Sequence, residues 1–157
     1  MAVWKLPPQA KVYEALSAVG DGRVTRLGPG EAEVRSSSGR RTYNVEWTPD
    51  LAGIRANDNG SYWQGYLGYP SIAVLMTLGR VTYEEASARA LAGVPWQELN
   101  RRFRRDYDAA VAEVLAGLEG RGVATAPIVA DAARIMAQLE GMELTRLPRR
   151  ARPPKEG

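Results

Sequence analysis

Residues 23–48 read RVTRLGPGEAEVRSSSGRRTYNVEWT, and this stretch decides the fold. Gly28-Pro29-Gly30 and Ser37-Ser38-Gly39-Arg40 are turn sequences that divide it into three short segments. In the last two segments apolar and polar residues alternate, which is typical of antiparallel strands with one buried face. The residues expected on the buried face are Ala32, Val34, Tyr43, Val45 and Trp47.

The flanking sequence extends this prediction on both sides. The predicted strands form an antiparallel meander. Before it, Val12, Leu16 and Val19 share one face of a helix predicted over about Gln9–Val19, and the turn Gly20-Asp21-Gly22 ends this helix. The predicted strands are Arg23–Leu27, Glu31–Ser36, Arg41–Thr48 and, after a further turn, an optional fourth strand at Gly53–Ala56.

The rest of the chain is predicted to be helical. Thr82-Tyr83-Glu84-Glu85 matches a capping box, and a stripe of apolar residues at steps of three and four follows Pro95. The predicted helices are Ser71–Leu78, Thr82 to about Ala92, Pro95 to about Leu118, and Ala126–Glu140 with Gly141 as C-cap.

These elements predict an α+β fold with an N-terminal helix, a three- to four-stranded antiparallel meander and a C-terminal bundle of about four helices. We expect a single domain over residues 1–147. Its meander half covers about residues 9–70 and its helical half about residues 71–147. Residues 148–157 are rich in Pro and Arg, so we expect a disordered basic tail there.

The chain contains no cysteine and no histidine, which excludes several kinds of chemistry. Disulfides, thiolate nucleophiles, Ser-His-Asp catalysis and zinc sites with Cys or His ligands are all ruled out. We expect no metal, no zinc and no cofactor. We also expect no membrane span and no signal peptide, hence a cytoplasmic location.

The net charge is modest at +3, but 18 arginines stand against 3 lysines. A GC-rich genome favours such a bias, and together with the absence of cysteine it is also compatible with a thermophile.

The segment Asn57–Pro70 fits neither a helix nor a strand, and its residues 62–69 contain four aromatic residues and two glycines. Exposed Tyr and Trp side chains can stack on bases or form a hot spot for a protein partner. Alternatively, these rings pack into the core beside Tyr43 and Trp47. The candidate partner-binding residues are Asn57, Asp58, Tyr62, Trp63, Gln64, Tyr66 and Tyr69.

A second candidate site is a group of four arginines within five residues of the predicted long helix. Arginines gathered on a helix can bind phosphates, so this group is a candidate nucleic-acid contact. Alternatively, it is a solvated helix face that Asp106 and Asp108 partly compensate. The residues are Arg101, Arg102, Arg104 and Arg105.

The first half of the chain, about Lys11 to Met76, resembles the SWIM-type zinc domain. As in that family, a helix, a meander with the strand Tyr43-Asn44-Val45, a turn-rich loop and an apolar helix beginning Ile72-Ala73-Val74-Leu75 follow one another. The family's Cys-x-Cys and Cys-x-His pairs would fall near Ile54–Ala56 and Gly68–Pro70, where this chain has no such ligands.

The resemblance therefore implies the layout without the zinc. In place of the metal, burial of the loop aromatics Tyr62, Trp63, Tyr66 and Tyr69 would hold the loop to the meander. SWIM-type domains are generally thought to bind nucleic acid or proteins, so the resemblance implies partners of these kinds.

Three functional hypotheses follow from the sequence. The first is a non-catalytic binding or adaptor module, whose Tyr/Trp-rich loop contacts a protein partner or a second copy of the chain. The second is a nucleic-acid-binding protein that combines the Arg101–Arg105 helix with the loop aromatics. The third is an enzyme independent of His and Cys, with Asp58 and nearby tyrosines in its site.

Overall fold

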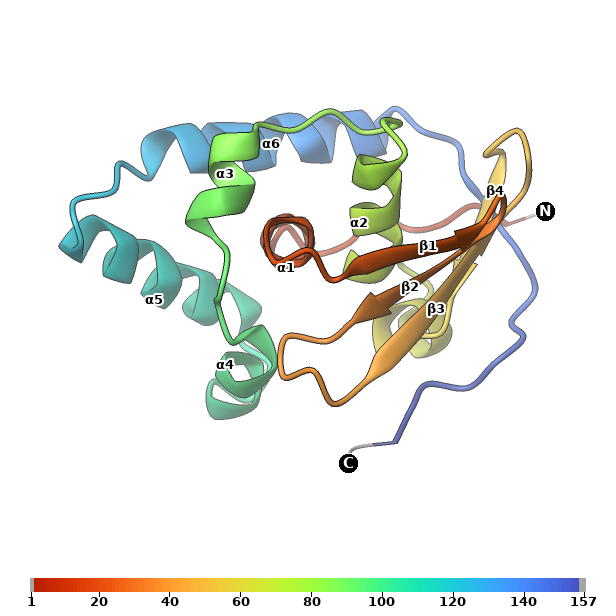
Figure 1. The fold of residues 1–157 in the computed structure, drawn as a ribbon, viewed down its shortest axis with the longest axis horizontal. Helices are drawn as coiled ribbons and strands as arrows, with labels where there is room; N and C mark the ends of the chain where they lie inside the picture. The colour runs from red at the N-terminus through yellow and green to blue at the C-terminus, as the bar shows by residue number, and fades with distance from the viewer. Residues whose placement is uncertain (1, 156–157) are drawn as a thin grey trace.

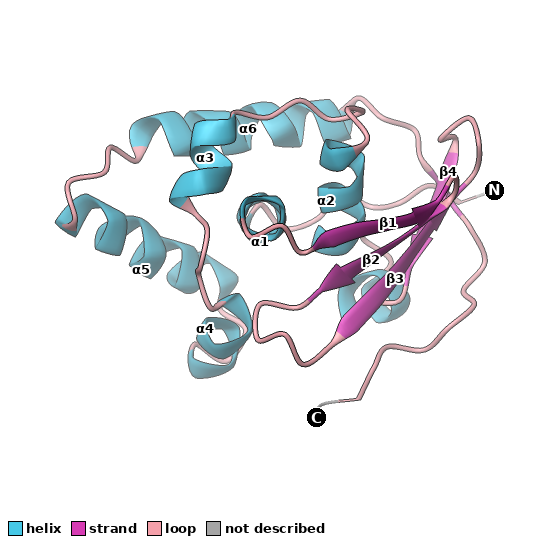
Figure 2. Ribbon diagram, viewed as in Figure 1, coloured by secondary structure: helices cyan, strands magenta, loops and turns pink. Residues whose placement is uncertain are grey.

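The computed structural model describes residues 2–155, and it confirms the α+β fold. A sheet and a group of helices lie side by side, and a helix of the first half stands at the centre of the molecule (Figures 1 and 2). One hydrophobic core contains residues of both halves, among them Val45 of the meander and Ile135 of the last helix.

The sheet has five strands in the order β1-β2-β3-β4-β5. Each of the first four strands is antiparallel to the next one in the sheet. Tyr43, Val45 and Trp47 lie on the buried face of β3, as predicted. The strands are β1 (Val24–Gly28), β2 (Glu31–Arg35), β3 (Thr42–Trp47), β4 (Gly53–Ala56) and β5 (Thr145–Arg146).

The fifth strand extends the predicted antiparallel meander, which β1 to β4 form. β5 pairs in parallel with β4, with Gly53 opposite Thr145, so the sheet is mixed. Near the other end of the chain, Val3 forms a bridge with Thr145. A two-residue strand gives too short a pattern to recognise in a sequence.

The first helix, α1 (Ala10–Gly20), is buried on all sides instead of on one face. It packs against α2 (Tyr69–Thr77), which in turn covers the inner face of the sheet, and also contacts α3 (Glu85–Ala90), α5 (Tyr107–Gly120) and α6 (Ala126–Glu140). Its polar side chains have partners there: Ser17 Oγ donates to Leu91 O at 2.7 Å and accepts from Trp96 Nε1 at 2.7 Å.

The capping box predicted at Thr82 does not form, and α3 begins later, at Glu85. Side chains of α6 hold the segment before it. Gln138 Oε1 accepts from Thr82 N at 2.8 Å, and the buried Asp131 accepts from Glu84 N at 3.0 Å. Tertiary contacts have replaced the local cap. Within residues 2–155, no helix combines the length and the apolar character that crossing a membrane requires.

The predicted helix from Pro95 to about Leu118 is two helices, α4 (Trp96–Arg102) and α5. The break lies at the arginine cluster and is part of the candidate site described below.

Residues 148–155 have no regular secondary structure and lie against the outer face of β3 and β4. Arg150 pairs with Glu46 at 2.9 Å, and Asn57 Nδ2 donates to Arg152 O at 3.2 Å. The predicted disordered tail covers this segment, and its last residues, 156 and 157, lie outside the described residues.

Candidate functional site

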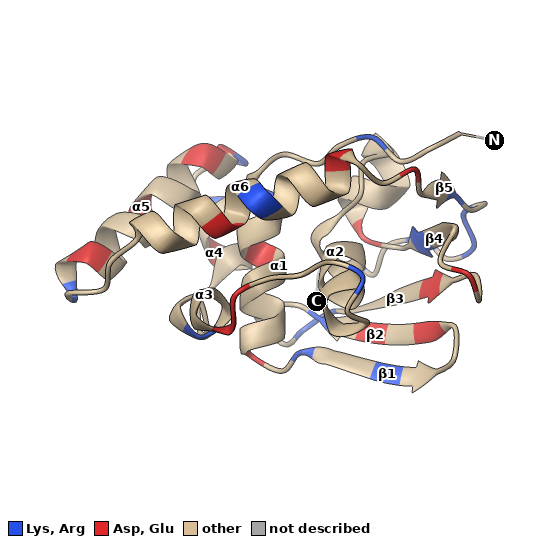
Figure 3. Ribbon diagram, turned by 90° about the horizontal axis from the view of Figure 1, so that it is seen from above, with Lys and Arg blue, Asp and Glu red and all other residues tan. Residues whose placement is uncertain are grey.

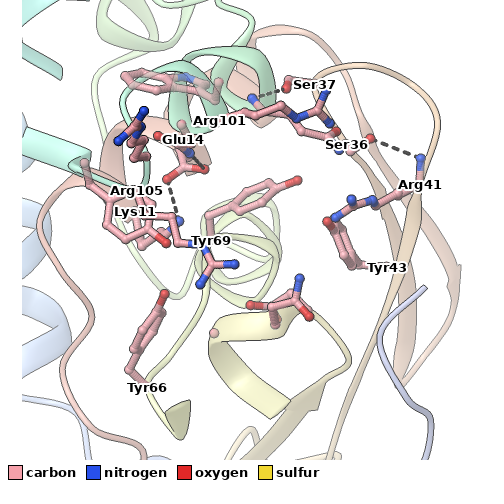
Figure 4. Close-up of a pocket in the computed structure, with 18 residues that line it drawn as sticks. Lys11, Glu14, Ser36, Ser37, Arg41, Tyr43, Tyr66, Tyr69, Arg101 and Arg105 are labelled. Atoms are coloured by element: carbon pink, nitrogen blue, oxygen red, sulfur yellow. Dashed lines mark hydrogen bonds and ion pairs between the residues drawn. The ribbon is translucent and has the colours of Figure 1, made fainter. Parts of the chain in front are cut away.

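A cavity of about 550 Å³ opens where the meander half meets the helical half (Figure 4). We call it the basic pocket. α1, the turn between β2 and β3, the loop before α2 and the segment from α4 to α5 form its walls. The lining residues are Lys11, Glu14, Ser36, Ser37, Arg41, Tyr43, Asp58, Asn59, Gly60, Tyr66, Tyr69, Trp96, Gln97, Asn100, Arg101, Arg104, Arg105 and Tyr107.

The turn between β2 and β3 is fixed to α4 by its serines. Gln97 N, in the first turn of α4, donates to Ser37 Oγ at 2.9 Å, and Ser38 Oγ donates to Gln97 Oε1 at 2.7 Å. Ser37 thus caps a helix that has no side-chain cap of its own. Arg41 N donates to Ser36 Oγ at 3.1 Å, which holds the start of β3 in the same unit. These bonds place Arg41 and Tyr43 in the pocket wall.

Positive charge dominates the lining, which has five basic residues against two acidic ones. The net charge of +3 with all groups ionised is as large as that of the whole 157-residue chain. Elsewhere, acidic and basic residues are interspersed over the helices and strands (Figure 3). The basic pocket is therefore a local concentration of positive charge.

Lys11 forms an ion pair inside the pocket. Lys11 Nζ lies 2.9 Å from Glu14 Oε2 and 4.0 Å from the ring centroid of Tyr107. Burial acts to lower the pKa of Lys11, but Glu14 and nearby tyrosines outweigh burial and raise it. The remaining charged groups of the lining are Asp58 and four arginines, Arg41, Arg101, Arg104 and Arg105.

The backbone that carries the last two arginines is strained. Arg104 and Arg105 have φ angles of 53° and 66°, in the left-handed region that favours glycine. Arg105 N donates to Asn100 O at 2.8 Å and Arg104 N to Arg101 O at 3.1 Å, the two bonds of a Schellman motif. This motif ends α4. Asp106 then caps α5 by accepting from Ala109 N at 3.1 Å, which is why one long helix does not form.

Arginine is an unfavourable residue for this turn. A residue with a Cβ loses about 1–2 kcal/mol in the left-handed conformation, and glycine is the usual choice at the position of Arg104. Strain of this kind is concentrated at functional sites in proteins. Both side chains are exposed and have no ion pair or hydrogen bond with the other described residues.

The strain gives a testable expectation for Arg104→Gly. Glycine relieves the turn, so chemical denaturation should show a gain of about 1 kcal/mol in the free energy of unfolding. Arg104→Ala is the matched control because it removes the same guanidinium but keeps the Cβ. Its stability should stay near that of the wild type, and equal stability of the two variants would contradict the assignment of strain to Arg104.

The fourth arginine of the cluster does not line the basic pocket. Arg102 pairs with Glu113 of α5 and lies 5.0 Å from the ring centroid of Phe103. It therefore ties α4 to α5, while Arg101, Arg104 and Arg105 face the cavity.

The segment Asn57–Pro70, which we call the aromatic loop, has some residues in the basic pocket and others outside it. Its centre is a single turn of π-helix, Gly60–Gln64, and its last aromatic residue, Tyr69, begins α2. Asp58, Tyr66 and Tyr69 line the basic pocket. Tyr62, Trp63 and Gln64 do not, and Asn57 holds the meander by accepting from Asn44 N at 2.7 Å.

In Figure 4, Tyr69 lies near the centre of the pocket, with Tyr66 at the lower left and Tyr43 at the right. The rings of Tyr43 and Tyr69 meet edge to face at 6.0 Å. Burial raises the pKa of Tyr66 to about 12 and also raises the pKa of Tyr43 and of Tyr69. These hydroxyls therefore stay neutral and can donate hydrogen bonds to a ligand.

Trp63 and Tyr62 form a separate surface. The indole of Trp63 is 60% exposed, and its ring meets that of Tyr62 at 4.5 Å. Arg149 lies 4.8 Å from the ring centroid of Tyr62 and donates from Nη1 to Tyr62 O at 3.2 Å.

Asp58 is a buried carboxyl group in the wall of the basic pocket. Its Oδ2 accepts from Ser61 N at 3.2 Å, and its Oδ1 has no hydrogen-bond partner among the described residues. Burial raises the pKa of this carboxyl above its usual range. Gly68 makes room for it, since a Cβ there would lie 2.0 Å from Oδ2.

Sequence reasoning missed the part of the site contributed by α1 and β3. Lys11 and Glu14 lie on α1, which is buried on all sides, and Arg41 directly precedes β3; no local sequence pattern marks these three residues. Among residues 2–155, no group of three or more acidic side chains is arranged to hold a metal ion.

The fold and the pocket together define an α+β protein with a basic, tyrosine-lined cavity between its two halves. The model of the family described as uncharacterised conserved protein UCP014422 matches residues 4–145, so the chain belongs to that family. Every residue that lines the basic pocket lies within the matched stretch. No curated protein and no solved structure matches the chain.

Proposed function

We propose that this protein binds a phosphate-bearing ligand in the basic pocket. The observation that carries the proposal is the pair Arg104 and Arg105, which a strained turn presents at a cavity already lined by Arg41 and Arg101. A conformation that costs stability persists where the surrounding structure and a function require it.

The number and kind of cations favour phosphate over a single carboxylate. One arginine can bind a carboxylate with two parallel hydrogen bonds, whereas four arginines suit a ligand with several anionic oxygens. The tyrosine hydroxyls add neutral donors. The volume of about 550 Å³ lies within the range of small-molecule sites.

The direct test is a titration of the pure protein with inorganic phosphate and with inorganic pyrophosphate at low chloride concentration. Trp96 lines the pocket and is 2% exposed, so its fluorescence should report occupancy. We expect saturable binding that is tighter for pyrophosphate and weakens as chloride is added. Absence of binding to both anions at low chloride would contradict the proposal.

The phosphate could belong to a small compound or to a nucleic acid, and a second arm of the experiment separates these sources. Light scattering with single-stranded oligonucleotides, with and without a terminal phosphate, measures complex formation. Binding that needs the terminal phosphate indicates a ligand end in the pocket. Binding without it, reversed by salt, indicates the nucleic-acid contact that the Arg101–Arg105 segment suggests.

The enzyme hypothesis has one supporting observation, because Asp58 lies in a concave site together with other polar groups. In the binding function that we propose, the same carboxyl contacts a ligand and no bond is broken.

A protein-partner surface at Trp63 is our second candidate function. The specific observation is the 60% exposure of this indole beside Tyr62 and Arg149, since aromatic residues and arginine are enriched in hot spots.

Trp63→Ala should therefore abolish association with a partner or a second copy while the unfolding temperature stays unchanged. Light scattering and thermal denaturation measure the two quantities. Val129→Ala, which truncates another exposed apolar residue, is the control and should leave association intact. Unfolding of Trp63→Ala would instead show that the loop is part of the core.

A further inference from the structure

We propose that Asp58 meets the bound anion as a neutral carboxylic acid and donates a hydrogen bond to it. Asp58 then carries one proton whenever an oxyanion occupies the basic pocket. This inference rests on the proposed function, because it requires an anion in the pocket.

One oxygen of the Asp58 carboxyl is buried without a hydrogen-bond partner. Asp58 is 6% exposed, yet it belongs to the pocket lining. Its Oδ2 accepts from Ser61 N, and both carboxyl oxygens pack against Gly68, where a Cβ would lie 2.0 Å from Oδ2 and 2.9 Å from Oδ1. Its Oδ1 has no hydrogen-bond partner among the described residues. Buried polar atoms in proteins almost always have partners, so this atom marks a position for a ligand oxygen.

An ionised carboxylate cannot serve that position well. It would repel an oxyanion and has only acceptors, whereas the protonated group has an O–H to donate. Burial already raises the pKa of Asp58, although hydrogen bonds from Ser61 and the charge of Lys11 act in the opposite direction. A bound anion raises the pKa further, because like charges disfavour ionisation.

Several groups around Asp58 keep their protons between about pH 5 and pH 8. Lys11 of α1, Tyr43 of β3, Tyr66 of the loop and Tyr69 of α2 all have raised pKa values. Glu14 of α1 forms an ion pair with Lys11, the arginines stay charged, and the chain has no histidine. The comparison with Asp58→Asn therefore assigns to Asp58 a pH-dependent affinity for an anion of fixed charge in this range.

Sulfate and inorganic phosphate form the diagnostic pair of probes. Sulfate carries no proton in this range, so it needs the proton of Asp58. Its affinity should fall about tenfold for each pH unit above the pKa of Asp58, because the ionised form prevails as the pH rises. Inorganic phosphate keeps a proton that it can donate to the ionised Asp58, so its affinity should not fall. Calorimetry in buffers of different ionisation enthalpy should show uptake of one proton per sulfate at the high end of the range.

Asp58→Asn supplies a permanent N–H donor of nearly the same shape. In this variant sulfate should bind with the same affinity across the pH range and without proton uptake. Asp108→Asn makes the same chemical change on an exposed residue outside the pocket and should behave as the wild type.

The outcomes separate the two proposals. If wild-type protein binds sulfate and phosphate with affinities that change in parallel with pH, and Asp58→Asn does the same, the role of Asp58 is wrong while the proposed function stands. If neither anion binds at any pH, both proposals are wrong.

Discussion

Replacing Arg104 and Arg105 together by glutamate is expected to abolish anion binding, with a loss of affinity for pyrophosphate of at least about 100-fold. Each charge-assisted hydrogen bond contributes about 1.5–3 kcal/mol, so losing two of them accounts for this factor. The double substitution also removes the positive net charge of the pocket lining, since two of its five basic residues become acidic. The titration with pyrophosphate described above measures the effect.

The same variant should remain folded. Neither arginine side chain has an ion pair or hydrogen bond with the described residues, and glutamate, like arginine, carries a Cβ in the strained turn. Arg80→Glu with Arg121→Glu is the matched control, because it makes the same change of charge at two exposed positions outside the pocket. Equal affinity of the two double variants would mean that net charge, and not the pocket, governs binding.

The second large effect is on stability, and it concerns the last residue of α1. A Cβ built on Gly20 would lie 2.0 Å from the carbonyl oxygen of Ala88, which belongs to the backbone of α3. α3 cannot move away cheaply, because Ser17 Oγ is bonded to Leu91 O at its C-terminal end and Asp131 to Glu84 N at its start. Gly20→Ala should therefore lower the free energy of unfolding by about 3 kcal/mol.

Gly117→Ala tests the specificity of this prediction. Gly117 is an exposed residue within α5, and the nearest atom to its Cβ would be Arg121 Nη1 at 3.6 Å. Alanine is the better helix former there, so this variant should gain about 0.5–1 kcal/mol. Chemical denaturation of both variants measures the opposite signs, and a stable Gly20→Ala would show that α1 and α3 separate easily.

The elements with strong local patterns could be predicted from the sequence. β2 and β3 alternate apolar and polar residues, and α6 has a regular apolar stripe, so their boundaries follow closely from periodicity. The break between α4 and α5 could not be predicted in this way. The apolar stripe continues across it, while Schellman bonds at Arg104 and Arg105, without the usual glycine, end the helix.

The candidate site could be predicted only in pieces. The sequence singled out the arginine segment and the aromatic loop separately, and the structure brings Arg101, Arg104 and Arg105 to Asp58, Tyr66 and Tyr69 around one cavity. Lys11 and Arg41 line the pocket because α1 and the start of β3 pack against distant parts of the chain. A local sequence pattern contains no information about such long-range packing. The resemblance to the SWIM-type layout stays a prediction, as do the cytoplasmic location and the kind of partner.

The parallel pairing of β4 with β5 has a consequence for synthesis of the chain. Gly53 of β4 finds its partner only when Thr145 has been made. At about 5–20 residues per second, that delay amounts to roughly 5–20 seconds on the ribosome. During this interval the edge of β4 is open to pairing with other chains, which is the usual route to aggregation. The segment around Trp4 also pairs late, because Trp4 N donates a hydrogen bond to Leu144 O. Completion of the sheet is therefore a late event, which brings residues 3 and 4 and β4 together with residues 144 and 145 in one step.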